Sequence, residues 1–205
     1  MIKIFCVEGT KGAGKTTTIQ NLRNFFETKK LSVVVKAPFY DVRPELKKLT
    51  GFENTYPASL DPIAAPLCND LLIKQITSDI NNKKADEILI FDRGWLTGLT
   101  TLLGSVLPAE QKQKEMKRWE SLMLPTIFLY TKPDNTLSVR KNELSFNVGL
   151  KDKKMVEHDF ILRYNLIQKY KNCVLSQVET FPLADDKEIQ QKILQNKFIE
   201  KVFYR

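Results

Sequence analysis

Short apolar runs alternate with longer amphipathic stretches along the chain. The apolar runs are rich in β-branched and aromatic residues and lie at 2–8, 31–37, 87–92, 125–131 and 172–177. The stretches between them are long enough to form helices. Strands buried on both faces of a parallel sheet read as near-continuous apolar runs, and the connections between them are usually helical. The pattern therefore predicts an α/β fold in which helices cover both faces of a parallel sheet.

Helical periodicity places long helices between and after these strands. They are expected at 15–29, 59–84, 108–124, 153–171 and 185–203. The helix at 59–84 is entered at Asp61-Pro62, because proline suits the first turn of a helix. No internal repeat, low-complexity segment or linker divides the 205 residues. We therefore expect a single domain spanning 1–205.

A glycine-rich segment separates the first predicted strand from the first predicted helix. It fits the pattern G-x-x-x-x-G-K-(S/T), which starts at Gly9 and ends with Gly14, Lys15 and Thr16. Glycines let the backbone approach a phosphate closely, and the N–H groups of the loop and the following helix attract its charge. In such a loop the lysine reaches the β- and γ-phosphates and the hydroxyl holds Mg²⁺. The segment predicts binding of ATP and Mg²⁺ by Gly9, Thr10, Lys11, Gly12, Ala13, Gly14, Lys15, Thr16 and Thr17.

The third predicted strand ends with an acidic and a basic residue, Asp92 and Arg93. An aspartate after a hydrophobic strand of a P-loop protein usually orients Mg²⁺, directly or through water. The guanidinium group beside it can clamp a phosphate with two parallel hydrogen bonds. We therefore expect Thr16 and Asp92 at the metal and Arg93 at a phosphate. The plain structural alternative is a salt bridge at the end of a strand.

Composition and charge narrow the chemistry. Apolar residues make up 42% of the chain and charged residues 27%, as in soluble globular proteins, and no apolar run is long enough for a membrane span. With no leader before the first strand, a cytoplasmic protein without membrane partners is expected. His158 is the only histidine, which argues against a zinc site or a Ser-His-Asp triad. The widely spaced Cys6, Cys68 and Cys173 read as buried thiols. The net charge of +8 suits polyanionic ligands.

These motifs together resemble the thymidylate kinase group of nucleoside monophosphate kinases. The segment "EGTKGAGKTT" matches all but one fixed position of the group's phosphate loop, E-G-x-D-G-x-G-K-T-T. The segment "DRGWLTGLTTL" has the group's Asp-Arg pair followed by a hydroxyl residue, Thr97. In "PTIFLYTKPDNTLSVRK", Arg140 lies where the group has a basic residue, and Tyr164 in "FILRYNLIQ" matches a tyrosine of the group. The resemblance spans nearly the whole chain.

The resemblance implies a three-layer P-loop kinase fold with a five-stranded parallel sheet. It also implies transfer of the γ-phosphoryl group of ATP to a nucleoside monophosphate. Arg93 would hold the acceptor phosphate, Lys15 and Arg140 would neutralise charge during transfer, and residues 141–154 would form a lid that excludes water. Thr97 and Tyr164 would lie on the substrate side. The resemblance leaves a homodimer open, because thymidylate kinases are commonly dimers.

Three departures from the group all concern the acceptor. Lys11 replaces an acidic residue that faces the acceptor sugar, and a lysine cannot accept a hydrogen bond from a hydroxyl. Leu67 and Leu71 replace the Phe and Arg that receive the thymine ring, and only Asp70 agrees with the group there. The group's Tyr-Gln pair falls on 101–102, a threonine and a leucine. The donor half of the site therefore matches better than the acceptor half.

Replacement groups for the acceptor follow the second and third predicted strands. Phe39 and Tyr40 could stack on a base, and Arg43 could bind its phosphate. Trp95 could line the same site. The structural alternatives are that Phe39 anchors its loop to the core and that Trp95 packs beneath the next helix.

Other functions stay open at this stage. The segment "TKPD" at 131–134 imitates a guanine-reading motif, but the D-x-x-G motif of such switches is absent because Gly94 comes one position early. A deoxynucleoside kinase would use Glu8 or Asp92 as a carboxylate base near the 5′-hydroxyl. A nucleic-acid acceptor fits the basic charge but is not favoured. A nucleotide-binding protein without kinase activity is the remaining alternative.

Overall fold

The structure is a computed structural model, and it describes residues 3–10, 12–130, 153–170, 178–182 and 187–200. The side chains of 153–159 are not described. The predicted lid at about 141–154 therefore lies almost wholly outside the described residues, as does Cys173. Among the described residues, no helix is both long and apolar enough to cross a membrane.

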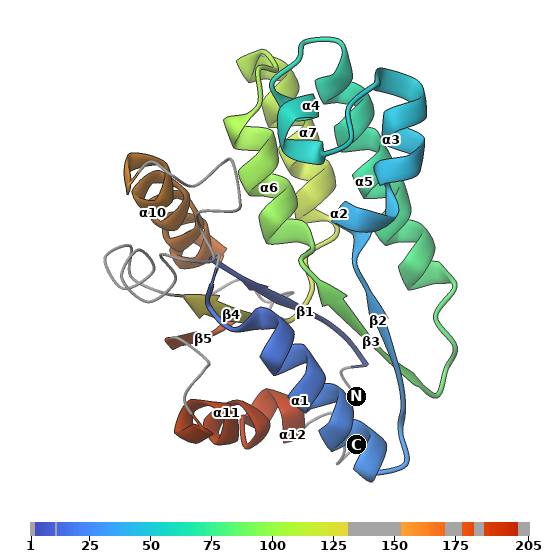
Figure 1. Cartoon of the computed structure of the whole chain (residues 1–205), viewed down its shortest axis with the longest axis vertical. Helices are drawn as coiled ribbons and strands as arrows, with labels where there is room; N and C mark the ends of the chain where they lie inside the picture. The colour runs from blue at the N-terminus through green and yellow to red at the C-terminus, as the bar shows by residue number, and fades with distance from the viewer. Residues whose placement is uncertain (1–2, 11, 131–152, 171–177, 183–186, 201–205) are drawn as a thin grey trace.

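Five parallel strands form the sheet (Figure 1). They are β1 (Ile4–Gly9), β2 (Ser32–Lys36), β3 (Glu87–Asp92), β4 (Thr126–Tyr130) and β5 (Val178–Pro182), in the spatial order β2-β3-β1-β4-β5. The five-stranded α/β fold with helices on both faces is thus confirmed. The fifth strand begins where the predicted run at 172–177 ends, and that run lies outside the described residues.

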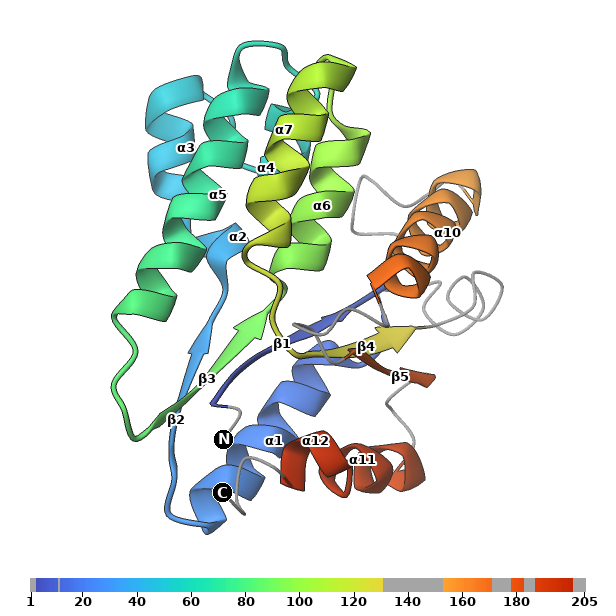
Figure 2. The ribbon, with the colours of Figure 1, turned by 180° about the vertical axis from the view of Figure 1, so that it is seen from behind.

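The two faces of the sheet carry separate hydrophobic clusters, because alternate side chains of a strand point to opposite faces. Phe5 and Val7 of β1 pack with the helices α1 (Lys15–Thr28), α11 (Lys187–Leu194) and α12 (Lys197–Glu200). Cys6, between them, packs on the other face with the larger group of helices. Figures 1 and 2 show α1, α11 and α12 below the sheet and the larger group above it.

The larger layer contains the helices α5 (Ala64–Asn81), α7 (Ala109–Glu120) and α10 (Lys153–Tyr170), all of which were expected. The helix predicted at 59–84 begins at Ala64. In the turn before it, the Asp61 carboxylate accepts hydrogen bonds from the N–H groups of Ile63 and Ala64 at 2.9 and 2.8 Å, which suits the predicted entry at Asp61-Pro62. Within the described part of the helix predicted at 185–203, the structure has two helices, α11 and α12; residues 185–186 and 201–203 lie outside the described residues.

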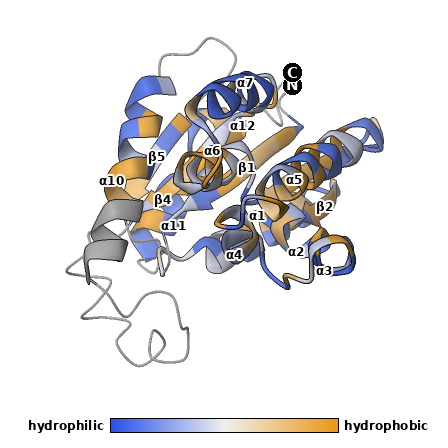
Figure 3. Ribbon diagram, turned by 90° about the horizontal axis from the view of Figure 1, so that it is seen from above, coloured by the Kyte–Doolittle hydropathy of each residue, from blue (hydrophilic) through white to orange (hydrophobic). Residues whose placement is uncertain are grey.

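Among the described residues, four helices were not predicted: α2 (Pro38–Asp41), α3 (Arg43–Thr50), α4 (Thr55–Ser59) and α6 (Trp95–Gly104). The first three are short. Helix α6 is apolar on nearly all sides and is mostly buried, so it lacks the alternation of polar and apolar faces by which a surface helix is found. Seen from above, β1 is mainly hydrophobic, whereas α7 is mainly hydrophilic (Figure 3).

Helix α6 packs closely against α7 at a glycine. A Cβ atom at Gly98 would lie 2.3 Å from the ring of Trp119, which is fully buried. The Trp119 indole N–H also donates to the Asn69 side-chain oxygen of α5 at 2.7 Å. The ring is therefore held between α5 and α6, and it has little freedom to move away from an added methyl group.

We expect Gly98→Ala to lower the free energy of unfolding by about 1–3 kcal/mol, the usual cost of overpacking a core. Gly104→Ala is the matched control, because Gly104 lies on the same helix and has nothing within 4 Å of an added Cβ atom. Urea denaturation of both variants measures the difference. A Gly98→Ala protein as stable as the Gly104→Ala protein would contradict this packing.

Candidate active site

The glycine-rich loop follows β1 at the carboxyl edge of the sheet, where ligands of such sheets bind. Gly9 has a φ of 151°, and a Cβ atom there would lie 2.0 Å from the Leu129 carbonyl oxygen of β4. The Thr10 N–H donates to the same carbonyl oxygen at 3.1 Å. Only glycine lets the loop leave the sheet this close to its neighbouring strand.

The loop leads directly into α1. Gly14 precedes the helix with a φ of 83°, in the left-handed region that glycine tolerates. The first turn of α1 contains no acidic residue, so its positive end is left for an anion. Thr16 and Thr17 are exposed in this turn, which suits the predicted role of Thr16 beside a metal ion.

The Lys15 side chain folds back over the loop. Its ammonium group donates to the carbonyl oxygens of Thr10 at 2.8 Å and Gly9 at 3.2 Å. Burial above all, together with the guanidinium groups of Arg93 and Arg163, lowers the pKa of Lys15 to about 7, against the opposing effect of the carboxylates of Asp92 and Glu8. Positive charges thus converge on the loop, and this is the electrostatic arrangement that a polyphosphate needs.

Asp92 and Arg93 lie beside this loop, since β3 and β1 are neighbouring strands. The Oδ1 atom of Asp92 is buried and has no hydrogen-bond partner among the described residues. A buried carboxylate oxygen of this kind fits a metal ion or a metal-bound water. Arg93 has a φ of 69°, an uncommon left-handed conformation for a residue with a side chain and one often found at functional sites.

The turn after Arg93 is held by a fully buried carboxylate, that of Glu8. Its Oε1 atom accepts hydrogen bonds from the N–H groups of Gly94, Leu96 and Thr97 at 2.7, 3.1 and 3.2 Å. Its Oε2 atom accepts one from the Thr97 hydroxyl. Glu8 therefore caps α6 from a different strand, and the alternative that it serves as a base for a nucleoside hydroxyl is wrong.

Arg163 of α10 joins the site and was missed in the sequence. It is 7% exposed, and its Nη1 atom donates to the Thr97 hydroxyl oxygen at 3.1 Å. Arg163 shares a helical stripe with Leu166, Ile167 and Tyr170, all of which are buried. A lone arginine on the apolar stripe of an amphipathic helix was the signal that could have revealed it.

Three predicted substrate residues are placed elsewhere by the structure. Tyr164 is 41% exposed and stacks on Phe160, because one step along the helix turns it away from Arg163. Trp95 is fully buried, and its indole N–H donates to the Thr126 hydroxyl at 2.9 Å, so it is a core residue. Thr97 is buried as well, with its hydroxyl bonded to Glu8 and Arg163, and it does not face a substrate directly.

The segment after β2 contains one buried and one exposed aromatic residue. Phe39 is buried in the core of the larger layer, so its proposed stacking on a base is wrong and the anchoring role is correct. Tyr40 is 57% exposed, and the Arg43 guanidinium lies over its ring at 4.0 Å. The Arg43 Nε atom is buried without a hydrogen-bond partner among the described residues. Tyr40 and Arg43 thus remain candidates for the acceptor.

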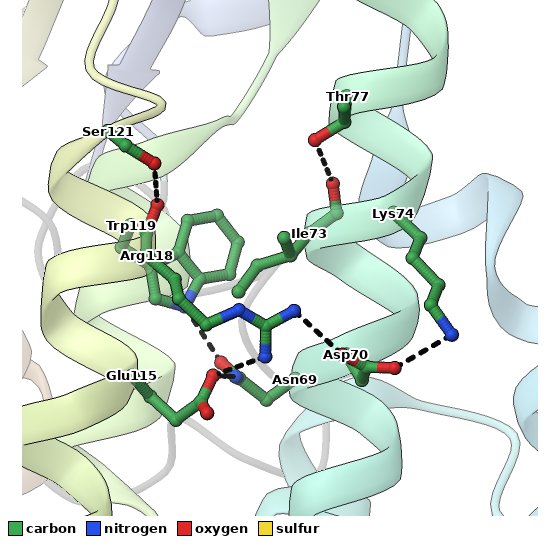
Figure 4. Close-up of polar contacts among 9 residues, drawn as sticks. All are labelled: Asn69, Asp70, Ile73, Lys74, Thr77, Glu115, Arg118, Trp119 and Ser121. Atoms are coloured by element: carbon green, nitrogen blue, oxygen red, sulfur yellow. Dashed lines mark hydrogen bonds and ion pairs between the residues drawn. The ribbon is translucent and has the colours of Figure 1, made fainter.

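Asp70 of α5 is paired with one residue of α7 and one of its own helix (Figure 4). Its Oδ1 atom accepts a hydrogen bond from Arg118 of α7 at 2.7 Å, and its Oδ2 atom pairs with Lys74 at 2.8 Å. The hydrogen bond from Lys74 and then that from Arg118 lower the pKa of Asp70. In the free protein this carboxylate ties α5 to α7, and its role in binding the acceptor stays a prediction.

Two predicted site residues, Lys11 and Arg140, lie outside the described residues, as does the segment 131–134. Cys6 and Cys68 are buried and free, as expected. In the part of the chain that the structure describes, no cluster of His, Cys, Asp and Glu could hold a metal ion by protein ligands alone. Thr16 and Asp92 would instead hold Mg²⁺ together with phosphate oxygens, which is how this ion usually binds.

One solved structure of similar fold is the YorR protein from Bacillus subtilis in complex with phosphorylated GDP. The TM-score is 0.57 at 14% sequence identity, and the match covers 98% of this chain and 99% of that chain. At this identity the similarity concerns the fold alone. No protein-family model and no curated protein matches the sequence. The closer relation to thymidylate kinases stays a prediction.

We expect nucleotide binding to be accompanied by proton uptake. Lys15 has a pKa of about 7 in the free protein, so it is largely neutral above that value, and the negative charge of a bound triphosphate would protonate it. At about pH 8.5 the complex should therefore take up close to ~1 proton, and at about pH 6 Lys15 is already charged and contributes none.

Calorimetric titration with a non-hydrolysable ATP analogue in two buffers of different ionisation enthalpy measures this uptake. Lys15→Arg is the control, because arginine stays charged at both pH values. Equal proton uptake by the wild-type and Lys15→Arg proteins at the higher pH would show that Lys15 is not the group that titrates.

Proposed function

We propose that this protein is a kinase that transfers the γ-phosphoryl group of ATP to a nucleoside monophosphate, in the manner of the thymidylate kinases that it resembles. The observation that carries the proposal is the convergence of Lys15, Arg93 and Arg163 on the glycine-rich loop, with the buried Oδ1 atom of Asp92 beside them. Phosphoryl transfer needs little beyond positioning and stabilisation of negative charge.

Each of these residues has its own role in the proposed transfer. The loop N–H groups and Lys15 hold the β- and γ-phosphates, and Arg163 adds charge from the side of α10. Thr16 and Asp92 would hold Mg²⁺, which supplies further neutralisation of the transferred group when it is bound. Arg93 holds the acceptor phosphate. Arg140 would neutralise charge during transfer, as the resemblance implies.

The acceptor is placed against α2 and α3 in this proposal. Tyr40 is the exposed aromatic residue there, and Arg43 has a buried donor atom that a bound ligand could satisfy. The phosphorylated GDP in the YorR structure supports the view that this fold holds phosphorylated nucleotides. Neither the base nor the sugar of the acceptor follows from these residues.

Incubation with Mg²⁺, γ-labelled ATP and a panel of acceptors tests the proposal. The panel contains each nucleoside and deoxynucleoside monophosphate, each deoxynucleoside and a short DNA. Labelled diphosphate from a monophosphate is the expected result, with thymidylate as the acceptor that the resemblance suggests. Label only on a deoxynucleoside or on DNA would replace the proposed acceptor, and ATP binding without any transfer would leave a nucleotide-binding protein.

Lys15→Ala should lower the transfer rate at least ~100-fold, because it removes the charge nearest the transferred group. Lys29→Ala is the matched control, since this exposed lysine follows the opposite end of α1. Steady-state kinetics with the accepted monophosphate compares the two. A Lys15→Ala protein with wild-type turnover would contradict the role given to the loop.

Arg93→Ala should raise the KM for the acceptor by about 10- to 100-fold, the cost of a lost hydrogen bond to a charged group. The affinity for ATP should change less. Arg23→Ala is the control, because Arg23 is exposed on α1 and pairs only with Glu27 among the described ion pairs. Unchanged acceptor kinetics in Arg93→Ala would remove Arg93 from the acceptor site.

A further inference from the structure

Three segments far apart in the sequence meet at one hydroxyl group, that of Thr97. Glu8 lies at the end of β1, Thr97 in the first turn of α6, and Arg163 on α10. The Thr97 hydroxyl donates to the Glu8 carboxylate and accepts from the Arg163 guanidinium at 3.1 Å. All of these side chains are buried, with exposed fractions of 0%, 5% and 7%.

The direction of these hydrogen bonds is fixed by the chemistry of the groups. An ionised carboxylate only accepts and a guanidinium only donates, so the Thr97 hydrogen must point to Glu8 and an oxygen lone pair to Arg163. Glu8 is itself fixed by the N–H groups of Gly94 and Leu96. The Glu8 carboxylate thus fixes the Thr97 hydrogen and leaves an oxygen lone pair of Thr97 to accept from Arg163 of α10.

We propose that Thr97, oriented by Glu8, is a positioning residue that holds the Arg163 guanidinium beside the phosphate loop and so couples α10 to bound nucleotide. This rests on the proposed function in one respect, namely that the phosphates occupy the loop. A plain threonine in the core would give stability to α6 alone. The coupling role instead predicts effects on ligand affinity and on α10 that depend on Arg163.

Two substitutions at Thr97 separate the hydroxyl from the shape of the side chain. Thr97→Val has nearly the same shape without the hydroxyl, and Thr97→Ser keeps the hydroxyl. Thr100→Val is the matched control, because the buried Thr100 hydroxyl on the same helix donates to the Leu96 carbonyl oxygen of its own helix. Loss of that bond should affect α6 but not Arg163.

We expect Thr97→Val to weaken binding of a non-hydrolysable ATP analogue by about 10-fold and to lower kcat, with the KM for the acceptor changed less. Thr97→Ser and Thr100→Val should stay within about 2-fold of the wild type. In an Arg163→Met background, Thr97→Val should add almost nothing, because the group it positions is gone.

Glu8→Gln gives an independent test. The three N–H groups require the amide oxygen of the glutamine, so its NH₂ group must face Thr97. The Thr97 oxygen has two lone pairs, so it can accept from that group and still accept from Arg163, with its own hydrogen turned elsewhere. We therefore expect Glu8→Gln to lose less affinity than Thr97→Val, and the difference between the two variants should vanish in the Arg163→Met background.

A measurement on the ligand-free protein tests this proposal independently of the proposed function. Amide hydrogen exchange in the free protein should be faster along α10 in Thr97→Val than in the wild type, and unchanged there in Thr100→Val. If the wild type binds no nucleotide, the proposed function fails while this exchange difference still tests the coupling. Equal exchange along α10 in Thr97→Val and Thr100→Val, or full additivity of Thr97→Val with Arg163→Met, would overturn the positioning role.

Discussion

The site depends on the hydrogen bonds that the buried carboxylate of Glu8 accepts. Glu8 stands one residue before the glycine-rich loop and accepts hydrogen bonds from three N–H groups and one hydroxyl at the start of α6. A buried charge is tolerable only when it is well hydrogen-bonded, so the turn that carries Arg93 must adopt one conformation. A Cβ atom at Gly94 would lie 2.6 Å from the Cys6 sulfur, and so the turn has no room for a larger residue. The backbone strain at Arg93 is held in place by these contacts.

The charges of the site are balanced for a ligand rather than for the free protein. Lys15, Arg93 and Arg163 face the loop together, and the nearby carboxylates of Asp92 and Glu8 only partly offset them. Glu8 is already committed to α6, which leaves Asp92 with a buried oxygen that lacks a partner among the described residues. The free protein relieves the repulsion through the lowered pKa of Lys15. A polyphosphate with its metal ion would satisfy the cations and Asp92 at once, which is why we read this edge of the sheet as a phosphate site.

Local patterns were enough to predict the sheet and the loop. Parallel strands buried on both faces and the spacing from Gly9 to Thr16 are properties of neighbouring residues, and they located the strands β1 to β4, α1 and the Asp92-Arg93 turn. The contacts that define the rest of the site join residues far apart in the sequence. Glu8 meets Thr97 across 89 positions, and Arg163 meets Thr97 across 66. Nor does a motif match resolve a single helical step: the matching Tyr164 is 41% exposed, whereas its neighbour Arg163 is buried and bonded to Thr97.

The acceptor half shows why a resemblance cannot be transferred residue by residue. At the positions that align with the residues receiving the thymine ring, this chain has Leu67, which is 41% exposed, and Leu71, and the adjacent Asp70 is paired with Arg118 and Lys74. A leucine side chain offers a ligand no hydrogen bond, and the Asp70 carboxylate already ties α5 to α7. Specificity must then come from groups that the packing leaves available at the same edge of the sheet. Among the described residues, Tyr40 and Arg43 meet that condition. The Tyr40 ring is exposed, and the buried Nε–H group of Arg43 has no hydrogen-bond partner among these residues. An acceptor held from α2 and α3 would thus take the place of the polar contacts that α5 and α6 do not offer.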